Sequence, residues 1–140
     1  PLELRGIVIK PRVTHKFLGL ILDQELRWKA QKDYAVGKGI AYTFQLRRLA
    51  KTNYGLPLAG VTHLYQGVSV RQTLYGAAVW YTPVHHRVGS KARKGSVEAT
   101  KRIATVQRAA ATSITGGLRS TATDVLDAHA GLLPVHHLLD

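Results

Sequence analysis

The chain has 140 residues, of which 45% are hydrophobic, so it is long enough to bury a modest core and too apolar for a disordered tail. The absence of cysteine excludes disulfides, thiolate metal sites and cysteine nucleophiles. Twenty Lys and Arg residues against eight Asp and Glu residues give a net charge of +12, which indicates a polyanionic partner: nucleic acid first, an anionic membrane or polysaccharide second.

Residues 1–23 predict a β-hairpin at the start of the chain. Leu4–Ile9 and Thr14–Leu22 are two short β-prone runs. Pro11 lies in the connection between them, where its missing N–H group does no harm. Gly19, inside the second run, indicates a bulge or the close approach of another backbone.

Residues 24–83 predict two amphipathic helices, the first of which runs from Gln24 to about Thr52. Asp23 closes the hairpin directly before this helix and can cap its N-terminus. Gly37 and Gly39 weaken the middle of the helix, so the pattern allows a kink or two shorter helices. Its apolar positions recur on one stripe: Trp28, Ala35, Tyr42, Leu46 and Leu49.

The second helix is predicted from Leu58 to about Trp80. The segment Asn53–Pro57 precedes it and carries a stop-and-start signal, with a glycine suited to end one helix and a proline suited to the first turn of the next. The apolar positions of this second helix recur about every 3.5 residues: Leu58, Val61, Tyr65, Val68, Tyr75 and Val79.

The rest of the chain divides into a loop and a C-terminal helical segment. Residues 84–96 are rich in Gly, Ser and basic side chains without an apolar period, which predicts a basic flexible loop. Residues 97–140 predict a third helix, closed by Gly116-Gly117, and a short fourth helix that Thr121–Asp124 starts through a capping-box variant. The third helix is marked by a stripe of apolar positions: Ala99, Ile103, Val106, Ala110 and Ile114.

These patterns together predict a single, mainly α domain, in which an N-terminal β-hairpin is followed by a bundle of three to four helices. We find no catalytic constellation in the sequence. Two-metal phosphoryl transfer needs clustered carboxylates, and no two acidic residues are adjacent here. The pairs His85-His86 and His136-His137 lack the i,i+4 spacing of a helical zinc site. We therefore expect no catalytic residue, metal site or cofactor in this segment.

The basic side chains gather in two places that suit phosphate contacts. One group lies off the apolar stripe of the first helix, and the other follows the loop into the third helix. Such contacts position a duplex and carry little sequence information. The expected nucleic-acid-binding residues are Lys29, Arg47, Arg48, Lys51, Arg87, Lys91, Arg93, Lys94, Lys101 and Arg102.

Four segments, taken in order, resemble one protein family. They are HKFLGLILDQELRWKAQ, LRRLAK, GLPLAGVTHLYQGVSVRQTLYGAAVW and VQRAAATSITGGLRSTATDVLDAHAGLLPV. Their order resembles the region after the polymerase palm in reverse transcriptases of non-LTR (LINE-type) retrotransposons, particularly fungal ones. The resemblance covers nearly the whole chain.

The resemblance implies a role for each segment. Residues 1–23 would form a primer-grip-like hairpin, residues 24–83 would form two thumb helices that hold the template–primer duplex, and residues 97–140 would lead toward a ribonuclease H domain. The family's catalytic aspartates and their Mg²⁺ belong to the palm, upstream of the hairpin, and no residue here matches them. The implied partners are RNA or an RNA–DNA hybrid, together with the palm and ribonuclease H domains.

Two other functions stay open. A domesticated interaction or defence protein would use the same positive charge to bind an anionic membrane or polysaccharide. A stand-alone hydrolase would need a site that the sequence does not reveal. The first residues show no signal peptide and no window holds eighteen uninterrupted apolar residues, so we expect an intracellular protein, nuclear or cytoplasmic.

Overall fold

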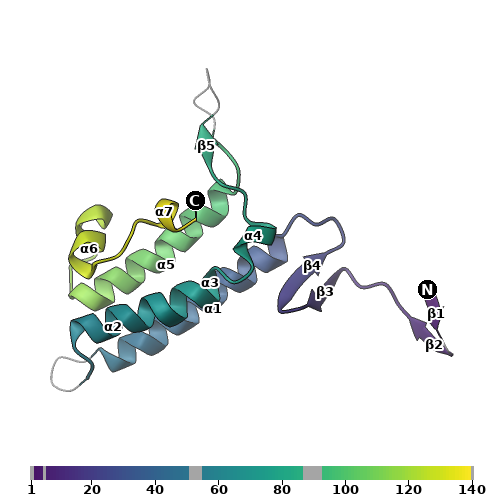
Figure 1. Ribbon diagram of the computed structural model, residues 1–140, viewed down its shortest axis with the longest axis horizontal. Coiled ribbons are helices and arrows are strands. Elements are labelled where there is room, and N and C mark those ends of the chain that lie inside the picture. Colours follow the sequence, from purple (N-terminus) through teal and green to yellow (C-terminus); the bar gives the residue numbers. More distant parts are fainter. Residues whose placement is uncertain (1, 5, 51–54, 87–92, 140) are drawn as a thin grey trace.

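The computed structural model describes residues 2–4, 6–50, 55–86 and 93–139. Most of these residues are helical, and strands form short antiparallel pairs at the N-terminal end, which confirms the fold class expected from the sequence. In Figure 1 the helices lie side by side in long rows, and the N-terminal strands extend from one end of the bundle.

Two hairpins form the N-terminal region, where the sequence predicted one. Their strands are β1 (Leu2–Leu4) with β2 (Ile7–Ile9), and β3 (Thr14–Phe17) with β4 (Leu20–Asp23). Each pair closes locally, because Gly6 has a positive φ in the first turn, and Leu18 and Gly19 both have one in the second. The prediction that Leu4–Ile9 pairs with Thr14–Leu22 is therefore wrong. Gly19 is a turn residue rather than a bulge.

Helix α1 spans Lys29–Leu49 as one element and begins five residues later than predicted. A tight turn precedes it, in which Leu26 and Trp28 have positive φ. The Asp23 carboxylate accepts hydrogen bonds from the backbone N–H groups of Arg27, at 3.0 Å, and Trp28, at 3.1 Å. Asp23 therefore holds the turn that leads into α1, whereas the N-cap position itself is Trp28.

The two central glycines of α1 do not interrupt the helix. Gly39 is buried at the closest approach of α1 to its neighbours: a Cβ there would lie 2.5 Å from the Thr73 hydroxyl oxygen and 3.2 Å from Val106 Cγ1. Gly37 has open space around it. The helix is therefore not divided into two shorter ones, and Gly39 instead permits close packing of the helices.

The predicted second helix is a row of four shorter elements: α2 (Leu58–Leu64), the π-helix η1 (Tyr65–Val70), α3 (Arg71–Thr73) and α4 (Ala77–Trp80). Gly76, with positive φ, separates the last two. Of the predicted apolar stripe, Val61 and Tyr65 are buried, whereas the other four side chains are exposed: Leu58, Val68, Tyr75 and Val79.

The residues that α2, η1 and α3 bury follow an i,i+4 series: Val61, Tyr65, Ser69 and Thr73. In a regular α-helix such a series drifts around the axis, because one turn holds 3.6 residues. The i→i+5 hydrogen bonds of a π-helix enclose more residues per turn. The wider turn of η1 therefore keeps the series on the inner face, which accounts for the failure of the predicted stripe.

The described part of the predicted basic loop forms a hairpin arm. Strands β5 (His85–His86) and β6 (Arg93–Lys94) are antiparallel, and the arm projects from the bundle in Figure 1. At its base the Ser96 N–H donates to the Thr82 carbonyl oxygen at 2.9 Å, and the Thr82 N–H donates to the Ser96 hydroxyl oxygen at 3.1 Å. These two hydrogen bonds close the arm where it leaves the helices.

Helix α5 (Val97–Thr115) is the predicted third helix, and all five side chains of its expected stripe are buried. Two short helices follow, α6 (Thr123–Ala130) and α7 (Val135–Leu138). The capping box predicted at Thr121 is wrong, because the N-cap of α6 is Ala122 and makes no side-chain cap. Arg108 holds this entry instead, since it donates to the carbonyl oxygens of Arg119 and Thr121 and to the Thr123 hydroxyl.

Two hydrophobic clusters lie along α5, and α1 runs beside it in the same direction. The cluster at the N-terminal half consists of Ala35, Val36, Trp80, Ala99, Ile103, Val106, Val135 and Leu139. The cluster at the C-terminal half consists of Val61, Tyr65, Ala110, Ala111, Ile114, Leu126, Ala130 and Leu132. Each cluster draws on segments far apart in the chain, so α5 is the central element of the fold.

Candidate nucleic-acid interface

The expected nucleic-acid-binding residues lie at opposite ends of the helical rows. Lys51, Arg87 and Lys91 fall outside the described residues. Arg47 and Arg48 lie in the last turn of α1. They are 18 or more residues from the start of that helix, or roughly 27 Å at 1.5 Å per residue. The sequence analysis therefore placed Lys29 in one group with Arg47 and Arg48, although they lie at opposite ends of α1.

A larger basic group lies at the end where α1 and α5 both begin and the β5–β6 arm leaves the bundle. It contains Lys29, Arg93, Lys94, Lys101 and Arg102. An ion pair between Arg102 and Asp33 joins the two helices at this end. Both partners are about half exposed, and such exposed pairs contribute only about 0–1 kcal/mol. We call these five residues the basic end.

A second group of cations, which the sequence did not reveal, surrounds Tyr34 on α1. The Lys16 ammonium, from β3, donates to the Tyr34 hydroxyl at 3.4 Å and lies 5.3 Å from the centroid of its ring. The Lys38 ammonium, one turn along α1, lies 5.0 Å from the same centroid. Lys38 also donates to the Gln72 side-chain oxygen on α3, at 3.3 Å.

We call Lys16, Tyr34 and Lys38 the lysine–tyrosine cluster. The two lysines change the pKa of the tyrosine. Hydrogen bonds from Lys38 and then from Lys16 lower the pKa of the Tyr34 phenol, and the charges of both lysines act in the same direction. Only two ion pairs occur among the described residues, Arg27–Glu25 and Arg102–Asp33, and neither involves these lysines. The cluster is thus a site of net positive charge.

The i,i+4 spacing of Tyr34 and Lys38 along a helix was visible in the sequence. The third member was not, because the position of Lys16 depends on the turn between β4 and α1. Leu26 and Trp28 adopt positive φ in that turn, although neither is a residue type that favours it. No local sequence signal marks such a turn.

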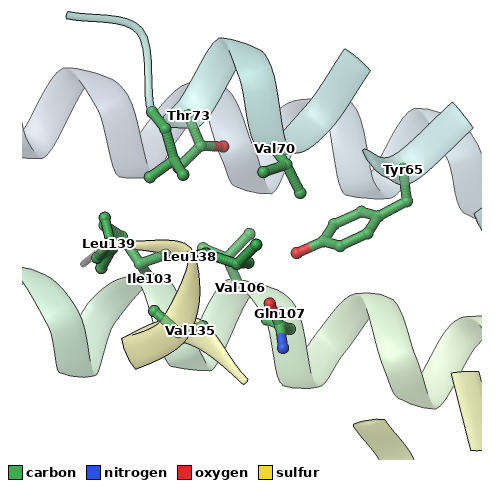
Figure 2. A pocket seen from close by; sticks show the side chains of 10 residues that line it. Tyr65, Val70, Thr73, Ile103, Val106, Gln107, Val135, Leu138 and Leu139 are labelled. Atoms are coloured by element: carbon green, nitrogen blue, oxygen red, sulfur yellow. The ribbon is translucent and has the colours of Figure 1, made fainter. Parts of the chain in front are cut away.

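A small cavity lies between the helices in the described part of the chain, and a larger, more open hollow of about 250 Å³ lies at the far end of α1 beside Arg48. Figure 2 shows the space between the α2–α3 row, α5 and α7, where Tyr65 and Gln107 bring polar groups to an otherwise mainly apolar lining. This cavity has a volume of about 10 Å³, which suits at most one water molecule. A binding function is therefore better sought on the basic surface.

The described ranges contain no group of three or more His, Cys, Asp or Glu side chains arranged to hold a metal ion. None of their helices combines the length and the apolar character needed to cross a membrane.

Comparisons with known proteins give two weakly similar relatives, both retrovirus-related Pol polyproteins. The one from type-1 retrotransposable element R1 of Bradysia coprophila is 29% identical over 80 residues, which are 57% of this chain and 8% of the relative. The one from element R1 4 of Nasonia vitripennis is 27% identical over 134 residues, which are 96% of this chain and 31% of the relative. The chain thus spans less than a third of the length of either relative.

No model of a known protein family matches the chain, and no solved structure matches it. The two Pol polyproteins support a retrotransposon-related origin, in agreement with the resemblance found in the sequence. The narrower expectation of a fungal element stays a prediction.

Proposed function

We propose that this chain is the nucleic-acid-holding part of a retrotransposon reverse transcriptase, the thumb and connection region that follows the palm. The observation that carries the proposal is the similarity to a Pol polyprotein along 134 residues of this chain. The net charge of +12 and the cations at the basic end support it. A protein of this kind would act inside the cell, in the nucleus or the cytoplasm.

The basic end would hold an RNA–DNA hybrid or an RNA duplex through its backbone phosphates. Lysine and arginine side chains on two helix starts and a projecting arm can follow a strand without reading its bases. The polymerase chemistry, with its Mg²⁺ and catalytic aspartates, would belong to the palm. The palm and a ribonuclease H domain would be the protein partners of this segment.

The test is a charge-neutralised variant of the basic end. Four exposed cations change to Gln: Lys29, Arg93, Lys94 and Lys101. We expect weaker binding of a fluorescent RNA–DNA hybrid in an anisotropy titration, and a salt slope flatter by roughly 3 to 4, because each phosphate contact contributes about −0.9. Hybrids of unrelated sequence should lose affinity equally, because backbone contacts do not read bases.

A matched control removes four exposed cations elsewhere, also by change to Gln: Lys10, Arg12, Arg71 and Arg119. It has the same net charge and should keep most of the salt slope. Equal losses in the two variants would contradict a defined interface. Tighter binding of heparin or of anionic vesicles than of hybrid, at the same salt concentration, would instead favour the polysaccharide or membrane function.

A further inference from the structure

The lysine–tyrosine cluster is held in place before any ligand binds. The hairpin that carries Lys16 is docked on α1 because the Ile21 N–H donates to the side-chain oxygen of Gln31 at 2.8 Å, and Gln31 is only 2% exposed. The same hairpin is held at its turn by the Tyr75 hydroxyl, which donates to the Leu18 carbonyl oxygen at 3.1 Å. Lys16 is therefore fixed relative to α1 by one contact at Ile21, its partner on the opposite strand, and by another at the turn.

Packing strengthens this attachment. Leu20 of β4 lies so close to Gly76 that a Cβ there would be 2.6 Å from Leu20 Cδ2, and Gly76 has a positive φ of 65°. Leu20 also packs against the cluster of buried side chains at the start of α5. The hairpin is thus part of the same packed unit as α1, which pre-organises the cluster for binding.

The donors of the cluster suit one oxyanion. Lys16 and Lys38 approach the same phenol from two elements and carry like charges that no carboxylate among the described residues neutralises. While the Tyr34 oxygen accepts from Lys16, its O–H remains able to donate. Two ammonium groups and one hydroxyl give the charge-assisted hydrogen bonds that favour an anion with several acceptor oxygens. A phosphate group has this character, and its charge would relieve the repulsion between the lysines.

We infer that Lys16, Tyr34 and Lys38 form a binding site for one backbone phosphodiester of a nucleic acid, where the β3–β4 hairpin meets α1. The inference rests on the proposed function and adds to it a site distinct from the basic end. The strand that crosses the basic end would have its backbone fixed a second time on the hairpin side of α1. The Tyr34 ring would report on this contact, because both lysine ammonium groups lie over it, 5.3 and 5.0 Å from its centroid.

The direct test follows Tyr34 by NMR in the full chain with ring-labelled tyrosine, its signal identified by comparison with Tyr34→Phe. Addition of the RNA–DNA hybrid should shift the Tyr34 signal and raise the pKa of its phenol, because the phosphate neutralises the lysines that lower that pKa. This measurement needs no lysine variant, so it does not depend on whether a variant folds. An unmoved Tyr34 signal in a saturated complex would overturn the site.

The second test removes the two charges. Lys16→Gln/Lys38→Gln should flatten the salt slope for the hybrid by about 1, since the site neutralises one phosphate and each phosphate contact contributes about −0.9. The matched control Lys10→Gln/Arg119→Gln should change it less. Equal slopes in the two double variants, with hybrid binding intact, would overturn the site and leave the proposed function standing. Failure of the unaltered chain to bind the hybrid would overturn both.

Discussion

Asp127 is an ionisable side chain that lies in the core of the protein. Its side chain is 5% exposed, and its Oδ1 atom has no hydrogen-bond partner among the described residues. Burial raises the pKa of this carboxyl, although a hydrogen bond from Gln107 and the charge of Arg108 act against the rise. The folded protein therefore holds the Asp127 proton at pH values where the unfolded chain has released it.

Because the folded state binds this proton more tightly than the unfolded state, the stability of the protein depends on pH. Below the unfolded pKa of 3.8 both states are protonated, and above it the free energy of unfolding falls with pH until the raised native pKa is passed. We expect Asp127→Asn to reduce this fall between pH 4 and pH 7, as measured by urea denaturation at several pH values. Glu3→Gln, an exposed carboxyl of β1 that does not contribute to the Asp127 shift, is the control. Parallel pH profiles for the wild type and Asp127→Asn would contradict the argument.

At the scale of the element, regular helices could be predicted from the sequence and irregular ones could not. In α5 the apolar positions Ala99, Ile103 and Ile114 lie on the buried face as expected, because nothing disturbs the 3.6-residue period. In the α2–α3 row the π-helix shifts the phase, so Val68 points to solvent while Ser69 is buried. The π turn has no sequence signal of its own, and the stripe was therefore misassigned.

In the candidate site, too, one part could be predicted from the sequence and another could not. The basic end follows from local charge runs, and the sequence named every described member of it, although it also added Arg47 and Arg48 from the far end of α1. The lysine–tyrosine cluster was missed because it depends on tertiary placement. Lys16 is 18 residues from Tyr34 in the chain, and the turn that brings them together has an unusual backbone.

The two glycines of α1 give a matched pair of substitutions. Gly37→Ala should stabilise the protein by about 0.5–1 kcal/mol, because alanine favours the helix and the position has open space. Gly39→Ala gains the same propensity but forces a methyl group against the Thr73 hydroxyl and Val106, an overpacking that costs about 1–3 kcal/mol. Thermal and urea unfolding should therefore place the two variants on opposite sides of the wild type. A stabilised Gly39→Ala would show that the α1–α3 contact has room to relax.

At the scale of the whole molecule, few of the positive charges of the described residues lie in ion pairs. The net charge is +12, and the two ion pairs of the described residues are both exposed. Like charges that folding brings together oppose the compact state, and salt screens them.

We accordingly expect the Tm to rise when NaCl is increased from 20 to 300 mM, as followed by circular dichroism. The four-residue Gln variant of the basic end should show a smaller rise, because it has less repulsion to screen. A Tm that is independent of salt in the wild type would mean that its charges are already too far apart to repel.

The closed base of the β5–β6 arm has a consequence for how this protein can vary in length. Thr82 and Ser96 satisfy each other's backbone groups, and a Cβ at Gly95 would lie 2.3 Å from the Pro83 carbonyl oxygen, so the two chain segments meet tightly. We therefore expect the helices to tolerate a change in the number of residues beyond that junction. The arm is therefore a suitable place to insert a binding element or a reporter without changing the helical bundle.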